Sequence, residues 1–286
     1  MYNIEYIFGQ TDDGLKLQGT HWNSLIKETC IVCIHGMGGN IIENYFPHVF
    51  GKMFTDNNIG FIYGHNRGYS HINDIETVSG EYKRIGTTYE IFEECVYDID
   101  LWVNEALKLG YKNVILFGHS FGCNKCIYYL SKNKNLNVIG LVLASPPDMQ
   151  GLTKLEEPNY DELMEEAQKN VNNHEPKKLL SSLLGNWNYI SSEAYINWFK
   201  TDSNCDNLPI LRNPEKFEQL SVIDIPILAF SGENEEELYK KLDLLKEKAI
   251  SCPDFEWTTI NNSGHTYKKV EENVAKLIVE WKNKIK

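Results

Sequence analysis

The stretch Phe117-Gly118-His119-Ser120-Phe121-Gly122 decides the fold of this chain. It follows the apolar run Val114–Phe117 and precedes a helical pattern over Asn124–Lys132. A serine between two glycines at a strand-to-helix junction is typical of a sharp turn that lifts its hydroxyl clear of a sheet. The flanking positions must be small because the strand and the helix pack closely there. The stretch therefore predicts that Ser120 is a nucleophile at the positive end of a helix.

On both sides of this turn, short apolar runs alternate with longer helical patterns. The runs that predict core strands are Ile31–Ile34, Ile59–Tyr63, Val114–Phe117, Val138–Ala144, Ile227–Phe230 and Phe255–Ile260. The patterns that predict helices are Tyr45–Asn57, Asp98–Leu109, Asn124–Lys132, Glu236–Ile250 and Val270–Lys286. Because the apolar runs do not alternate with polar residues, we expect strands that are covered on both faces. The pattern predicts an α/β fold with a mostly parallel central sheet flanked by helices.

Two segments depart from this alternation. Near the start, Glu5–Phe8 and Leu15–Trp22 enclose an Asp-Gly turn and predict a β-hairpin. Between residues 149 and 221 no convincing strand occurs, and Leu163–Val171 and Ser191–Phe199 have helical patterns. We therefore expect a core of residues 1–148 and 222–286, with 149–221 inserted as a helical cap over the carboxyl edge of the sheet.

A nucleophilic serine needs a base and an acid that orients the base, in the chain order Ser, acid, His. His265 is the histidine that follows the last predicted strand, in a loop before the final helix. The acid is expected after Ile227–Phe230, where the sequence offers several glutamates. By its offset from the strand, Glu235 is the first choice, and Glu233 is the alternative.

Acyl transfer also needs N–H donors for the developing oxyanion. One is expected from Phe121, directly after the nucleophile, and the second from Met37 in the turn His35-Gly36-Met37-Gly38-Gly39. A glycine-rich turn after a strand is also found in phosphate-binding loops. This turn lacks their G-K-[ST] ending and the G-x-G-x-x-G spacing, so we favour the oxyanion interpretation.

With these residues in view, the sequence resembles the α/β-hydrolase superfamily. The resemblance rests on the turn at 35–39, the elbow at 118–122, the acidic turn at 232–235 and Ser263-Gly264-His265. It implies the α/β-hydrolase fold with a variable cap and a serine hydrolase activity. Two features depart from many relatives, which have aspartate where this chain has His65 and where it has its acidic residue Glu235. The superfamily hosts many activities, so the resemblance does not identify a substrate.

The remaining polar residues near the expected site have two interpretations each. Arg67 could bind an anionic substrate group or could support its loop. His65 and His71 could contribute to a metal site or could form loop hydrogen bonds, and we favour the second because no carboxylate partner is evident. The spacings Cys30/Cys33 and Cys123/Cys126 suggest zinc ligands, but residues three apart on a strand face opposite sides. We expect no metal and no cofactor.

The composition excludes some classes of protein. The formal net charge is −12, which argues against a general binder of nucleic acid or of anionic membranes. No apolar run approaches the roughly 20 residues of a membrane span, and the N-terminus has no basic, apolar leader pattern. We therefore expect a cytoplasmic protein. Its oligomeric state does not follow from the sequence.

Together these features predict a serine hydrolase that cleaves the carboxylic ester of a small molecule. Aromatic residues of the insertion, Trp187, Tyr195 and Trp198, are expected to line an apolar acyl pocket. Alternatively, they fill the core of the insertion. A thioesterase or acyltransferase would use the same residues, as would an enzyme that cleaves amide or carbon–carbon bonds. A protein that only binds its ligand on this fold is the alternative outside catalysis.

Overall fold

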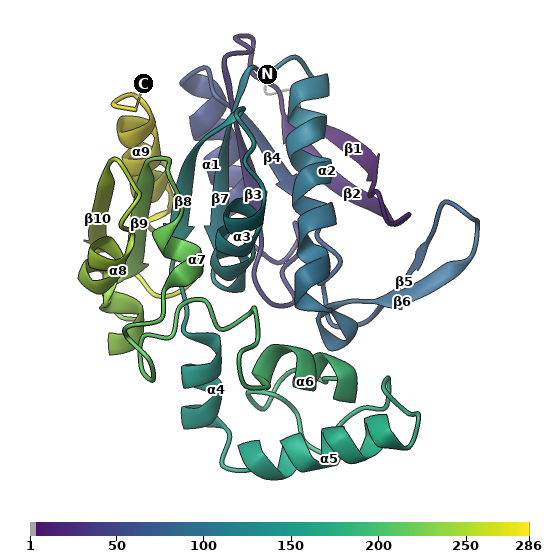
Figure 1. Ribbon diagram of the computed structural model, residues 1–286. Helices are drawn as coiled ribbons and strands as arrows, with labels where there is room; N and C mark the ends of the chain where they lie inside the picture. Colours follow the sequence, from purple (N-terminus) through teal and green to yellow (C-terminus); the bar gives the residue numbers. More distant parts are fainter. Residues whose placement is uncertain (1–3, 286) are drawn as a thin grey trace.

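The computed structural model describes residues 4–285, without the side chains of residues 237 and 238. Eight strands form one sheet in the order β1-β2-β4-β3-β7-β8-β9-β10 (Figure 1). They are β1 Ile4–Gln10, β2 Lys16–Trp22, β3 Thr29–Ile34, β4 Gly60–Gly64, β7 Asn113–His119, β8 Val138–Ala144, β9 Ile227–Gly232 and β10 Phe255–Ile260. All pairs from β4 to β10 are parallel, whereas β1 and β2 form an antiparallel hairpin beside β4. The predicted mostly parallel sheet and the N-terminal hairpin are confirmed.

Helices cover both faces of the sheet (Figure 1). They are α1 Phe46–Asp56, α2 Cys95–Lys108, α3 Phe121–Lys132, α8 Leu242–Lys248 and α9 Glu271–Lys282. In β3, Ile31 and Cys33 pack in the apolar cluster that includes α1 and α9. Cys30 and Val32 pack in the cluster that includes α2 and α3. Both faces of this strand are buried, which explains why its sequence shows no polar alternation. Cys30 and Cys33 therefore lie on opposite faces and do not form a metal site together.

Residues 149–221 contribute none of the eight described strands. They hold α4 Met149–Glu156, α5 Tyr160–Asn172, α6 Ser192–Phe199 and the short α7 Glu218–Ser221. The segment from α4 to α6 lies beyond the end of the sheet at which β8 leads into α4 (Figure 1). Its apolar side chains form a third buried cluster, which also includes Phe121 at the start of α3. This cluster joins the segment to the turn after β7.

The structure differs from the sequence prediction in two places. A second hairpin, β5 Asn73–Glu76 and β6 Tyr82–Ile85, projects from the body of the molecule (Figure 1). Its strands are only four residues long, so they lack the apolar run on which the prediction relied. The helix expected over 236–250 is split into a 3-10 turn, η3 Glu237–Lys240, and α8. Two further 3-10 turns, η1 Thr87–Tyr89 and η2 Phe92–Glu94, precede α2.

None of the helices described within residues 4–285 combines the length and the hydropathy that crossing a bilayer requires.

Candidate active site

Ser120 lies in the turn between β7 and α3, in a backbone conformation that side chains rarely adopt. Its φ is 55° and its ψ is −130°. A conformation of this kind costs on the order of 1–3 kcal/mol and persists where the surrounding packing holds it. The packing here requires glycine: a Cβ on Gly122 would lie 2.0 Å from the carbonyl oxygen of Ile34. A Cβ on Gly118 would lie 2.7 Å from the backbone of Cys123. The two glycines therefore let β3, β7 and α3 approach closely enough to hold Ser120 in place.

The structure brings His265 and Glu235 together from two different loops. The Nδ1 atom of His265 lies 3.3 Å from Oε2 of Glu235. The carboxylate is 3% exposed and the imidazole is 36% exposed, so the ring has one side toward the acid and another toward solvent. The remaining nitrogen, Nε2, is thus available on the side away from Glu235.

Buried donors hold the Glu235 carboxylate in place. Its Oε1 atom accepts hydrogen bonds from the Ser145 hydroxyl at 2.5 Å and from the Gly232 N–H at 2.9 Å. Burial raises the pKa of Glu235, but the hydrogen bond and charge of His265, with these two donors, bring it below its usual value. The acid is therefore ionised at neutral pH, as a group that orients a histidine should be.

Glu233, the alternative acid, lies elsewhere. Its side chain is exposed, and its Oε2 accepts a hydrogen bond from the Asn262 N–H at 2.8 Å. This contact connects the two loops that carry Glu235 and His265. The geometry thus favours Glu235 as the partner of His265.

His119, the residue before Ser120, is a buried neighbour of His265. Its Nε2 lies 2.8 Å from the backbone oxygen of His265, and a neutral ring protonated at Nε2 can donate this hydrogen bond. Burial and then the charge of His265 lower the pKa of His119 to about 3. His119 is therefore neutral at physiological pH and fixes the loop of His265 by its hydrogen bond.

This lowered pKa predicts a pH-dependent contribution to stability. Below about pH 6.5 the unfolded ring of His119 binds a proton that the folded ring does not. The folded state therefore loses stability as the pH is lowered from about 6.5 to about 3. We expect the unfolding free energy of the wild type, minus that of His119→Gln, to decrease by up to about 1.4 kcal/mol for each unit by which the pH is lowered in this window. Urea unfolding of both proteins at a series of pH values measures the difference. A difference that stays constant with pH would contradict the assignment.

The expected oxyanion donors flank Ser120. The N–H of Phe121 is the first of α3, and the first N–H groups of a helix have no acceptor inside it. In the turn after β3, Gly38 donates to the Thr87 hydroxyl and Gly39 donates to the Gly36 carbonyl, whereas the Met37 N–H has no acceptor among the described residues. A Cβ on Gly36 would lie 2.8 Å from the Cβ of Ser120, so this turn runs directly beside Ser120.

A cavity of about 360 Å³ opens over these groups. Ser120, His265 and Met37 line it, together with one face of α4 and the loop that carries Trp187. The structure records no hydrogen bond between the Ser120 hydroxyl and the His265 ring within residues 4–285, but both border the same space. Such catalytic contacts are often long without substrate and shorten when it binds.

The three aromatic residues predicted to bind substrate have different positions. Trp187 lines the cavity and is about half exposed. Tyr195 and Trp198 do not line it and are fully buried. The Tyr195 hydroxyl donates to the carbonyl of Tyr160, and the Trp198 indole donates to the carbonyl of Glu90. For these two residues the sequence interpretation is corrected, because their α6 face packs on α5 and on the segment before α2.

The sequence did not reveal the buried groups that hold Glu235 in position. Ser145 follows β8, and its hydroxyl connects Glu235 with the Tyr267 hydroxyl, at 2.5 and 2.6 Å. Its positive φ of 54° was not visible in the sequence. The face of α4 toward the cavity was also missed, although its spacing of three and four residues is the usual signal of one helical face.

The sequence matches one known protein family over most of its length. The model of a family described as a protein of unknown function, DUF1749, matches residues 92–281, which is more than half of the chain. The chain belongs to the DUF1749 family. No curated protein sequence matches it.

Solved structures similar to this DUF1749 protein share its fold at low sequence identity. An esterase of Pyrococcus furiosus has a TM-score of 0.62 and 15% identity, over 99% of this chain and 92% of its own. Est1E of Butyrivibrio proteoclasticus has a TM-score of 0.63 and 15% identity, over 97% of each chain. The α/β hydrolase GrgF of Penicillium has a TM-score of 0.66 and 15% identity, over 99% of each chain. The DUF1749 protein therefore has the α/β-hydrolase fold that its motifs implied.

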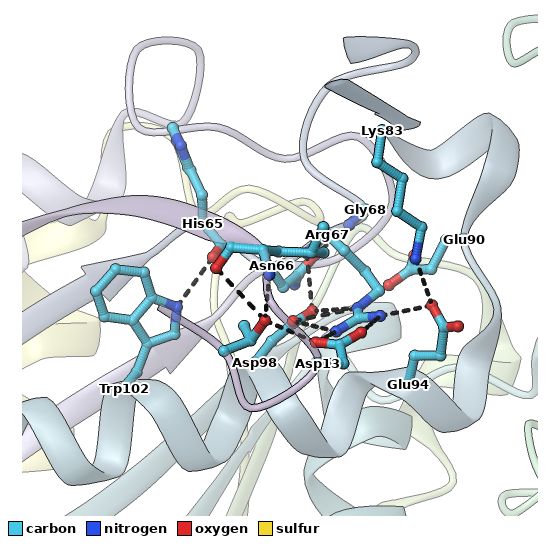
Figure 2. Close-up of polar contacts among 12 residues, drawn as sticks. Asp13, His65, Asn66, Arg67, Gly68, Lys83, Glu90, Glu94, Asp98 and Trp102 are labelled. Carbon is cyan, nitrogen blue, oxygen red and sulfur yellow. Dashed lines mark hydrogen bonds and ion pairs between the residues drawn. The ribbon is translucent and has the colours of Figure 1, made fainter. Parts of the chain in front are cut away.

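Arg67 of this DUF1749 protein is buried and points toward three carboxylates, of which Asp98 is fully buried and Asp13 and Glu94 are partly exposed (Figure 2). Its guanidinium contacts Asp98 at 2.9 Å, Asp13 at 2.9 Å and Glu94 at 2.5 Å, and it is 2% exposed. Its backbone N–H also donates to Asp98. The guanidinium is paired with carboxylates of the protein itself. The structure therefore supports the loop role of Arg67 over the binding of an anionic substrate group.

The two histidines weighed as metal ligands make other contacts. The His65 ring stacks on Tyr69 with centroids 4.4 Å apart, and its Nε2 accepts from the Ile41 N–H. The Nδ1 of His71 lies 2.7 Å from the side-chain oxygen of Asn188. Within the part of the chain that the structure describes, no three residues of the metal-binding types gather at one point.

Proposed function

We propose that this protein is a serine hydrolase that cleaves carboxylic esters of small molecules through an acyl-enzyme on Ser120. One observation carries the proposal. A single cavity is bordered by a strained serine, by a histidine that a buried glutamate contacts, and by the turn that carries the Met37 N–H. These are the nucleophile, the base with its orienting acid and the oxyanion donors that acyl transfer requires.

In the first half of the proposed reaction, His265 Nε2 removes the proton of the Ser120 hydroxyl. The Ser120 Oγ attacks the ester carbonyl, and the N–H groups of Met37 and Phe121 stabilise the oxyanion. Glu235 stays ionised and stabilises the imidazolium of His265. When the tetrahedral intermediate collapses, the carbon–oxygen bond to the alcohol breaks and His265 protonates the leaving alkoxide.

In the second half, water takes the place of the alcohol. His265 removes a proton from the water, whose oxygen attacks the acyl carbonyl on Ser120. Collapse of this second intermediate breaks the bond to Ser120 Oγ, and His265 returns the proton to the serine. The acid product leaves and the enzyme is regenerated.

Residues 149–221 form the cap in this proposal. Their α4 and the Trp187 loop border the cavity, which gives the acyl group or the alcohol a partly apolar wall of Met149, Leu152 and Leu184. An apolar or aryl substituent suits such a wall. One solved structure of Est1E is described with ferulic acid bound, which supports a small aromatic acyl group as one candidate.

The esters that this wall accepts are tested with p-nitrophenyl esters from acetate to decanoate. We expect kcat/KM to rise by about three- to fourfold with each added methylene until the cavity is filled, because each buried methylene contributes about 0.8 kcal/mol. Release of p-nitrophenol is measured against enzyme-free buffer. Acetate as the best substrate by far would overturn the apolar acyl pocket. Folded protein without turnover of any ester would favour a ligand-binding role.

Thioesters remain within the proposed chemistry because they use the same nucleophile, base and oxyanion donors. Acyl transfer to an alcohol other than water would also use them. The same ester series, run with added alcohols, separates hydrolysis from transfer by the ratio of acid to new ester.

A further inference from the structure

One face of α4 borders the cavity beside Ser120. The lining residues Met149, Leu152, Thr153 and Glu156 follow the spacing of three and four residues that places side chains on one side of a helix. The face begins with apolar side chains and ends in a carboxylate. Glu157, directly after the helix, adds a second carboxylate to the lining.

The charge on the cavity wall is of one sign. Glu156 and Glu157 line it, and the described lining residues include no lysine or arginine. Glu157 is 6% exposed, and one of its oxygens accepts the Gly185 N–H. No ion pair joins either glutamate to a residue within the described range 4–285. Two carboxyl side chains therefore line the cavity, and no lysine or arginine stands beside them in the described lining.

Glu156 is more exposed than Glu157, and the local environment disfavours further negative charge beside both. Both glutamates lie at the carboxyl end of α4, where the helix dipole is negative and disfavours anions. Burial, together with the negative charges of Glu236 and Glu157, raises the pKa of Glu156. A positive charge placed in the cavity would relieve this repulsion, whereas a second anion would increase it.

Aromatic rings line the same cavity as these carboxylates. Trp187 and Tyr239 border the same cavity, and the Tyr239 ring lies 5.2 Å from that of His265. The faces of tryptophan and tyrosine attract cations, with ammonium groups held in aromatic surroundings as a recurrent case. Carboxylates and aromatic faces thus favour the same kind of ligand.

We propose that the cavity selects esters that carry an ammonium group, which Glu156 and Glu157 contact while the ester carbonyl lies at Ser120. The inference rests on the proposed function and names its substrate class. Neutral esters are accepted through the apolar part of the wall, and anionic esters are rejected. Specificity here arises from the two carboxylates, so it should be removable without changing Ser120 or His265.

The test compares two p-nitrophenyl esters of the same shape. One carries the trimethylammonio-butanoyl group, and the other is its uncharged isostere with carbon in place of nitrogen. We expect kcat/KM of the wild type to be about tenfold higher for the cationic ester. Glu156→Gln and Glu157→Gln should each lower this ratio, and the double variant should bring it close to one. The control is Glu165→Gln, an exposed residue of α5 that is not part of the cavity lining, which should keep the wild-type ratio.

The outcomes separate this inference from the proposed function. Equal or faster hydrolysis of the neutral isostere by the wild type overturns charge selection and leaves the esterase intact. A ratio that does not respond to the double variant overturns the role of the two glutamates. If neither ester is hydrolysed, the acetate-to-decanoate series decides the hydrolase proposal, and the charge inference is decided by calorimetric binding of both esters to Ser120→Ala. Equal affinities there overturn it, and tighter binding of the cationic ester supports it.

Discussion

Ser120→Ala is expected to lower kcat/KM for p-nitrophenyl esters by about a thousandfold or more. In the proposed mechanism the change removes the one oxygen that attacks the carbonyl, and it leaves only the oxyanion donors and binding to act on water. The backbone at this position keeps its φ of 55°, so both residues bear similar strain and stability should change little. Initial rates of p-nitrophenol release from both proteins, at equal concentrations of folded enzyme, measure the loss.

The control for this variant is Ser131→Ala on the same helix, α3. The Ser131 hydroxyl donates to the Tyr128 carbonyl and does not line the cavity, so its loss should leave the rates near those of the wild type. Turnover by Ser120→Ala at a rate close to that of the wild type would contradict the acyl-enzyme. The protein would then be a hydrolase of another mechanism.

The largest expected effect on stability is that of Arg67→Met. Removing the guanidinium leaves the fully buried Asp98 carboxylate without its ion-pair partner, and Asp13 and Glu94 remain nearby (Figure 2). Breaking a buried pair from one side typically costs about 3–5 kcal/mol. Methionine keeps much of the side-chain volume, so the loss reports charge more than packing. Urea unfolding at neutral pH measures it.

A second ion pair of the same protein is the matched control. Arg84 on β6 makes two hydrogen bonds to Asp74 on β5, but both side chains are half exposed. Exposed pairs typically contribute about 0–1 kcal/mol, so Arg84→Met should change stability little. Equal losses of unfolding free energy in the two variants would show that burial of the Arg67 ion pairs does not determine their contribution to stability.

The Arg67 network also bears on the site, because the loop of Arg67 continues into the segment that supports the oxyanion turn. Ser70 donates to the Gly38 carbonyl, and the Thr87 hydroxyl connects the Gly38 N–H with the Gly68 carbonyl. These bonds fix the backbone beside Met37. The network thus explains how a buried arginine outside the cavity lining can help to hold the turn that carries Met37 in position.

Local sequence was enough to predict the strands of the parallel sheet and to select Ser120 and His265 as candidate site residues. The glycines at 118 and 122 report a close approach of backbones that only glycine permits, so the motif is a direct record of the local geometry. The apolar runs record burial on both faces of each strand in the same way. The order Ser, acid, His then restricts the base to the loop after the last strand.

Choices among similar side chains required the tertiary structure. Glu233 and Glu235 are two residues apart in one acidic turn, and their difference lies in distant partners: Asn262 for one, Ser145 and His265 for the other. The same holds for Trp187, which lines the cavity, and Trp198, which packs inside the cap segment.

The sequence by itself therefore determined which strands are buried on both faces, the turn with its serine and the loop that carries the histidine. Each of these depends on neighbours along the chain. Only the tertiary structure decided which carboxylate contacts His265, that Arg67 faces inward and that Glu156 borders the cavity. The physical reason is that burial and charge pairing of a polar side chain depend on what other segments bring to it, and those segments lie 31 to 90 residues away along the chain.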